Sequence, residues 1–263
     1  MLNATTYYRA ITKDYSRTLA GTASGVTASR ETDYFLANIG KVKSADALLK
    51  NNKLYAYVMK AFGLTDKINA KGLIRKVLEG GVSGPKSLAT TLHDPRYKAL
   101  ATAFNFAANG AATTSMTAAQ QGTVDKYVQQ TLEANVGQQN EGAQMALYFQ
   151  RMAPNIATAY NILGDKTLLK VVQTAFGLPV SMSQQNIDMQ AKLINNQLKI
   201  SDLQNPAKLK KFIERFTATY DSKNASTAPT NPTSAMLFSS ASGAAGVSSD
   251  LLLRLANLKL GGS

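Results

Sequence analysis

The sequence predicts an all-α protein, a compact multi-helix bundle with two related halves and a flexible C-terminal tail, and three observations lead to this prediction. Apolar side chains recur at helical spacing along most of the chain, whereas no segment shows sustained apolar–polar alternation between hairpin turns. Glycine and proline fall at the ends of the periodic segments. One stretch of sequence recurs later in the chain, which suggests a duplicated module.

The helical periodicity can be followed from the N-terminus to the C-terminus. Apolar stripes indicate helices over about 116–136, from Met145 to Met152 and from Phe212 to Tyr220. We expect about ten to twelve helices in all from this spacing. The clearest stripe occurs twice at i, i+4 and i+8, as Leu54, Val58 and Phe62 and again as Leu168, Val172 and Phe176.

The ends of the predicted helices carry the residues that helix ends favour. Gly63 and Gly177 each follow an Ala-Phe pair at a helix C-terminus, where a residue with positive φ is favoured. Asp94-Pro95 and Asn205-Pro206 each read as an N-cap followed by proline at the first helical position, where the missing N–H costs nothing.

The internal repeat joins residues 48–64 to residues 162–178, an offset of 114 between the starts at 48 and 162. Both segments end in Ala-Phe-Gly-Leu, and their apolar positions coincide. Two copies are too few for a solenoid. We therefore predict one all-helical domain over residues 1–221, with an internal repeat of about 31–110 and 141–221.

The composition changes after this domain. Residues 222–249 are rich in Ser, Thr, Ala and Pro and predict a flexible linker. Residues 250–263 form a short Leu-rich amphipathic segment that we expect to dock on its own domain, on a second copy of the chain or on a foreign partner. The alternative is a disordered end that happens to be rich in leucine. The candidate partner-binding residues share one apolar face: Leu251, Leu252, Leu255 and Leu258.

Residues suited to catalysis are few. The chain has no cysteine and one histidine, His93, which excludes disulfides, thiolate metal sites and multi-histidine metal sites. Gly80–Ser87 resembles a phosphate-binding loop, but Pro85 stands where the loop requires glycine. His93-Asp94 reads as a helix end followed by an N-cap, and no Gly-x-Ser-x-Gly elbow supplies a nucleophile. We predict that the protein is not an enzyme and uses no cofactor and no metal.

The net charge of +13 is concentrated in the first hundred residues, which carry 16 Lys/Arg against 7 Asp/Glu. These basic side chains are spread over several predicted helices, a pattern typical of solvated faces. Non-specific nucleic-acid binding is the alternative function, although no known nucleic-acid-binding motif accompanies the charge. No apolar run approaches the roughly 20 residues that a membrane span needs, and the N-terminus lacks the apolar core of a Sec signal peptide.

Four segments together are similar to one known family. They are Arg30–Lys43, Ala56–Leu64, Asp94–Tyr97 with Phe104–Phe106, and Gln139–Phe149. Over about residues 5–222 the chain resembles a family of uncharacterised alphaproteobacterial proteins, classed as a domain of unknown function and often encoded within flagellar gene clusters. The resemblance implies a helical fold and a place in flagellar assembly or structure, without any reaction. It favours a protein-binding factor that is cytoplasmic or exported by the flagellar secretion route.

Overall fold

The computed structural model describes residues 3–84 and 87–225, and every regular element in these two ranges is helical, which confirms the all-α prediction. The two ranges contain fifteen α-helices and five 3-10 helices, where about ten to twelve helices were expected. The difference arises from short elements such as α7 (Leu88–Thr91) and α9 (Phe106–Asn109). A single helical turn is too short to produce a periodic apolar pattern.

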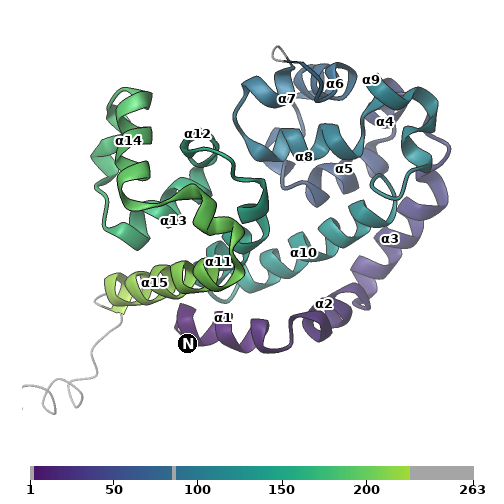
Figure 1. The fold of residues 1–263 in the computed structure, drawn as a ribbon. Helices are drawn as coiled ribbons and strands as arrows, with labels where there is room; N and C mark the ends of the chain where they lie inside the picture. The colour runs from purple at the N-terminus through teal and green to yellow at the C-terminus, as the bar shows by residue number, and fades with distance from the viewer. Residues whose placement is uncertain (1–2, 85–86, 226–263) are drawn as a thin grey trace, which may run out of the picture. The chain divides into compact units, whose positions relative to one another are not determined.

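The helices form two groups, each around its own apolar core (Figure 1). The first group comprises α3 (Val26–Ile39), α4 (Ala45–Lys50), α5 (Asn52–Ala61), η1 (Thr65–Lys67), α6 (Lys71–Gly80), α7, α8 (Pro95–Ala103), α9 and η2 (Gly110–Ser115). The second comprises α11 (Glu141–Met152), η3 (Ala153–Asn155), α12 (Ala159–Leu163), α13 (Lys166–Phe176), η4 (Val180–Gln184), α14 (Ile187–Gln197), η5 (Ile200–Gln204) and α15 (Pro206–Ala225).

One long helix, α10 (Gln121–Gly137), belongs to both cores. Its N-terminal part places Val124 and Val128 in the first core, and its C-terminal part places Leu132 and Val136 in the second. Helix α10 begins at Gln121 rather than near residue 116, because residues 116–120 form a turn that follows the 3-10 helix η2. The two cores are therefore joined by a continuous, hydrogen-bonded helix.

The N-terminal helices α1 (Ala4–Lys13) and α2 (Tyr15–Ala23) pack against the neighbouring helices α11 and α10. Helix α1 packs on α11 and places Tyr8 in the second core, while α2 packs on α10. The first backbone N–H groups of α1 are held by the last helix: the Asp221 carboxylate accepts from Ala4 N at 2.7 Å and from Thr5 N at 3.0 Å. The start of the N-terminal helix is thus tied to the last helix.

The predicted helix ends are confirmed in detail. Gly63 and Gly177 have φ values of 68° and 65°. In each case the following residue donates a backbone hydrogen bond five residues back, from Leu64 to Met59 at 2.8 Å and from Leu178 to Gln173 at 2.9 Å. This six-to-one bond satisfies a carbonyl that the helix end would otherwise leave free.

The predicted N-caps before proline are confirmed as well. The Asp94 carboxylate accepts from Arg96 N at 2.9 Å, and the Asn205 side chain accepts from Ala207 N at 3.0 Å. Helices α8 and α15 accordingly begin at the prolines, Pro95 and Pro206. These side chains occupy backbone donors that have no partner within the helix.

The two groups share an order of elements and a set of packing partners. The run α3–α4–α5–η1–α6 in the first group corresponds to α11–α12–α13–η4–α14 in the second, apart from η3. Helices α3 and α5, α4 and α5, and α4 and α6 pack together, and so do α11 and α13, α12 and α13, and α12 and α14. The duplication itself stays a prediction, which a superposition of the two runs tests.

Residues 1–223 form one compact unit. Helix α15 continues to Ala225, beyond residue 222 where the linker was expected to begin. Neither proline nor glycine interrupts the end of this helix, and Asp221 within it is fixed by α1. The rest of the predicted linker and the Leu-rich segment 250–263 lie outside the described residues. Among the helices of 3–84 and 87–225, none is long and apolar enough to cross a membrane.

Candidate functional site

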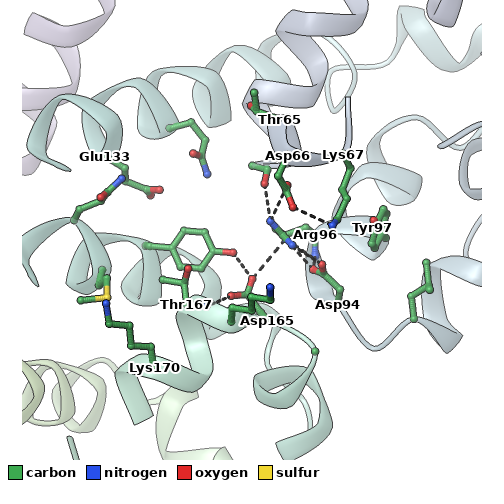
Figure 2. Close-up of a pocket in the computed structure, with 18 of the residues that line it drawn as sticks. Thr65, Asp66, Lys67, Asp94, Arg96, Tyr97, Glu133, Asp165, Thr167 and Lys170 are labelled. Atoms are coloured by element: carbon green, nitrogen blue, oxygen red, sulfur yellow. Dashed lines mark hydrogen bonds and ion pairs between the residues drawn. The ribbon is translucent and has the colours of Figure 1, made fainter. Parts of the chain in front are cut away.

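A cleft of about 790 Å³ lies between the two groups of helices (Figure 2). Elements η1 and α8 of the first group form one wall, α11 and α13 of the second group form the other, and α10 contributes Gln130 and Glu133. Most of the side chains that line it are polar or charged. This cleft is the place where both predicted halves contribute to one surface.

Arg96, near the start of α8, is the central side chain of the cleft. Its guanidinium donates to both carboxylate oxygens of Asp94, at 2.8 Å from Nη2 and 3.1 Å from Nε. It also donates to the Gly63 carbonyl at 2.8 Å. The Asp66 and Asp165 carboxylates each lie 3.5 Å away. One guanidinium therefore connects η1, α8 and α13.

Helix N-termini hold the carboxylates of this cluster in place. Asp165 is the N-cap of α13 and accepts from the backbone N–H groups of Thr167 and Leu168 at 2.8 and 3.0 Å. Asp94 has the same role in α8. The positive end of each helix dipole stabilises a carboxylate at this position. Each carboxylate is thus oriented by the helix that it caps, independently of Arg96.

The protonation states of the cluster are fixed by burial and by these partners. Burial lowers the Arg96 pKa, but the hydrogen bonds and the charge of Asp94 outweigh it and the pKa is raised. Burial and the Asp165 carboxylate both raise the pKa of Tyr148, whose hydroxyl donates to Asp165. Arg96 therefore stays charged and Tyr148 stays a neutral donor at ordinary pH.

A second buried ion pair lies next to the cleft, between α10 and α11. Arg151 donates to the two carboxylate oxygens of Glu133 at 2.6 and 3.0 Å, and Glu133 is 2% exposed. Burial lowers the Arg151 pKa, but the Glu133 carboxylate raises it. At the exposed rim, Lys170 lies 2.7 Å from Glu141. Most charges in and around the cleft thus already have a partner of opposite sign.

The hydrogen bonds and ion pairs of the cleft connect helices of the two groups. Over residues 3–84 and 87–225, no three His, Cys, Asp or Glu side chains are arranged to hold a metal ion. His93 stands at the turn before α8 with a φ of 55°, and its carbonyl accepts from the Asn161 side chain at 3.0 Å. Its ring lies 5.8 Å from the Tyr160 ring. Asp94 acts as the expected N-cap beside it.

The sequence did not identify the Arg96 cluster. Its members are separated by up to 99 residues, from Asp66 to Asp165, and only the packing of the two groups brings them together. The one local signal was an arginine two residues after an N-cap aspartate. The candidate residues that the sequence did identify lie outside the described residues, and their role in binding stays a prediction: Leu251, Leu252, Leu255 and Leu258.

Exposed apolar side chains gather at η4 and the start of α14. Val180 is 77% exposed, Ile187 54% and Met189 51%. The Gln190 side chain donates to the carbonyl of Gln185 at 2.8 Å and so ties the turn to the helix. We call Val180, Ile187 and Met189 the apolar edge. Large apolar residues grouped in one fixed segment are typical of contact surfaces.

Two comparisons identify related proteins. The sequence profile of a family described as "Protein of unknown function (DUF1217)" matches residues 61–209. A crystal structure of a protein from Agrobacterium tumefaciens is 41% identical, with a TM-score of 0.78 over 83% of this chain and 93% of that one. No curated protein matches the chain.

Proposed function

Because the chain belongs to the family of proteins of unknown function DUF1217, we propose that it acts as a non-enzymatic protein-binding factor, accessory to flagellar assembly or structure. The flagellar part rests on the resemblance to alphaproteobacterial proteins that are often encoded in flagellar gene clusters. The binding part rests on an observation of the molecule itself. The family relationship supports the flagellar role, and the exposed apolar surface supports protein binding.

The apolar edge is the observation that carries protein binding. Three large apolar side chains within ten residues are each more than half exposed. Covering one such side chain contributes on the order of 1–2 kcal/mol, so the edge offers a modest contact rather than a permanent one. The Leu-rich segment 250–263 offers a second contact of the same chemistry, either to a flagellar protein or to another copy of the chain.

The cleft supports a role without catalysis. The central side chains of the cleft are bonded to one another or to helix N-termini, namely Arg96, Asp94, Asp165 and Tyr148. A group that acts as an acid or a base must reach a substrate with a proton to give or to take. Side chains already committed to mutual hydrogen bonds are suited to hold two helical groups together.

Deletion of the gene in its native host tests the proposal. We expect impaired swimming or incomplete flagella, restored by the wild-type gene and not by a variant with Ile187→Asp and Met189→Asp. A matched control replaces Asn195 and Asn196, exposed neutral side chains of α14 outside the apolar edge, by Asp and so changes the net charge by the same amount. Normal swimming with normal flagella in the deletion strain would reject the flagellar role. Fractionation of the same cells decides between a cytoplasmic protein and one exported by the flagellar route.

A further inference from the structure

A second hollow, of about 690 Å³, follows the line where α3 packs against α5. Each helix contributes four positions at i, i+3, i+4 and i+7, which is one face of a helix over two turns. We call this hollow the α3–α5 groove. With Thr65 and Ile68, its lining residues are Thr27, Arg30, Glu31 and Tyr34 from α3, and Lys53, Ala56, Tyr57 and Lys60 from α5.

The floor of the groove is aromatic and rigid. The Tyr57 ring is stacked between the rings of Phe35 and Tyr127, with centroids 4.3 and 4.0 Å apart. The Tyr57 hydroxyl lies 2.9 Å from the hydroxyl of Thr32. Ala56 is exposed beside this stack and leaves room above it. The stack leaves Tyr57 only 5% exposed, so the apolar surface open to a ligand consists mainly of Ala56 and of Tyr34, which is 37% exposed.

The rim of the groove is basic. Arg30 and Lys53 are exposed and form no ion pair within the described residues, and the Lys53 ammonium lies 5.1 Å from the centroid of the Tyr34 ring. The third cation, Lys60, donates to the Tyr127 hydroxyl at 2.9 Å. That hydroxyl in turn donates to Glu31, so the one carboxylate of the lining is already engaged. The charge left for a ligand is positive.

The second group of helices contains the corresponding surface between α11 and α13. At the offset of 114 residues, α11 has four residues at the positions of the α3 wall, and all four line the cleft. They are Glu141, Gln144, Met145 and Tyr148, in place of Thr27, Arg30, Glu31 and Tyr34. Thr167 and Lys170, which correspond to Lys53 and Ala56, line it too. Here the surface faces another helical unit, since η1 and α8 of the first group form the opposite wall.

One ion pair crosses that occupied surface, because Arg96 of α8 lies 3.5 Å from Asp165, the N-cap of α13. The position equivalent to Asp165 in the first group is the neutral Asn51, and the rim there has Arg30 and Lys53 in place of Gln144 and Thr167. The first group thus lacks the carboxylate and has a basic rim, so a unit that matches this rim carries carboxylates.

We propose that the α3–α5 groove binds an amphipathic helix of a partner protein that presents apolar side chains to Tyr34 and Ala56 and carboxylates to Arg30 and Lys53. The proposal rests on the protein-binding function above and names the chemistry of its partner. The four positions on each wall span about 10 Å at 1.5 Å per residue, room for about two turns of a helix. Helices with apolar residues at i, i+3, i+4 and i+7 bind such grooves.

The charge of the chain favours a foreign partner over its own segments. The Leu-rich segment 250–263 has one acid, Asp250, against Arg254 and Lys259. A second copy of the chain carries the same net charge of +13 and is repelled on approach. An acidic protein is attracted instead, and its association with the groove weakens as added salt screens the charges.

Selection of short random peptides on the full-length protein tests the proposal. We expect the enriched peptides to carry Asp or Glu beside an apolar stripe of helical spacing. Their affinity, measured by fluorescence anisotropy, should fall about tenfold or more in the Arg30→Glu/Lys53→Glu variant, the effect of about 1.4 kcal/mol. Ala56→Trp, which fills the groove without changing its charge, should also abolish binding. The control Lys76→Glu/Lys98→Glu changes the net charge equally at exposed positions outside the groove and should bind as the wild type does.

Several results would overturn the proposal. Enriched peptides that are not acidic, or that bind the Arg30→Glu/Lys53→Glu variant as tightly, place the contact elsewhere. Self-association that these two substitutions abolish makes a second copy the occupant. Tighter binding of an oligonucleotide than of any selected peptide, lost in the same variant, makes nucleic acid the ligand.

The same variants in cells separate this proposal from the general one. If the deletion strain fails to swim and the Arg30→Glu/Lys53→Glu strain swims normally, the groove proposal fails and the flagellar function stands. If the deletion strain swims normally, the flagellar function fails, and the peptide measurements alone decide whether the groove binds acidic helices.

Discussion

Replacement of Arg96 by methionine should destabilise the whole helical unit, because this one side chain connects three elements. Methionine has a similar length and fills much of the same volume. It cannot donate to Asp94 or to the Gly63 carbonyl, and it removes the cation beside Asp165. The substitution therefore isolates the polar role of Arg96 from its packing.

The expected loss of stability follows from the two carboxylates that stay buried when Arg96 is removed. The side chains of Asp94 and Asp165 are 7% and 3% exposed, and both keep their backbone donors when Arg96 is removed. Breaking a buried pair from one side costs about 3–5 kcal/mol. Because the backbone N–H groups still bind both carboxylates, we expect the free energy of unfolding to fall by about 3 kcal/mol, the lower end of this range. For a unit of this size the melting temperature should fall by roughly 6–12 °C.

Urea denaturation followed by circular dichroism measures the change in the free energy of unfolding. Arg96→Met, Asp94→Asn and the double variant form a cycle in which asparagine keeps the N-cap. We expect a coupling energy of about 1.5–3 kcal/mol, the range for hydrogen bonds to charged groups. A loss below about 1 kcal/mol for Arg96→Met, or a coupling near zero, would refute the reasoning that the bonds of Arg96 stabilise the helical unit.

Four further outcomes are expected. Glu133→Ala leaves Arg151 buried without its partner and should cost about 3–5 kcal/mol in urea denaturation, unlike Glu141→Ala at the exposed rim. Burial raises the Tyr8 pKa to about 12, so the unfolded state loses this proton first. Between about pH 10 and 12 the wild type should therefore lose up to about 2–3 kcal/mol more stability than Tyr8→Phe, in which Tyr148 and other buried tyrosines still titrate; thermal melts across this range decide. DNA should bind only weakly, at about 10⁻⁴–10⁻⁶ M, with steep salt dependence in anisotropy titrations; nanomolar binding at physiological salt favours the nucleic-acid function. Leu251→Asp/Leu255→Asp should leave the melting temperature unchanged and alter the oligomeric state or partner recovery, whereas loss of folding would place these leucines in the core.

Helix periodicity and helix ends were predictable because their causes are local. An N-cap aspartate followed by proline, as at Asp94, or a glycine after the last apolar residue, as at Gly177, decides the backbone within one turn. The start of α10 was misplaced, since Thr114 bonds to the distant carbonyl of Val42 at 2.7 Å and helps to hold η2 as a separate element. Such a contact leaves no trace in the nearby sequence.

The sites were less predictable because they depend on pairs that meet only after folding. Arg96 and Asp165 are 69 residues apart, and Glu133 and Arg151 lie on different helices. In the sequence these side chains resemble the many solvated charges of a basic protein. The α3–α5 groove was hidden in the same way, since each of its walls reads as an ordinary helix face until the two helices pack.

The sharing of α10 by both cores limits which changes of length this family can tolerate. An α-helix advances about 100° and 1.5 Å with each residue. One residue inserted between Val128 and Leu132 would turn the second core by that angle relative to the first, and would carry Asp165 away from Arg96. Insertions of one or two residues should therefore be harmful within α10 and tolerated in an exposed turn such as Ser24-Gly25, between α2 and α3. Related chains should accordingly vary in length at their loops while the length of α10 is kept.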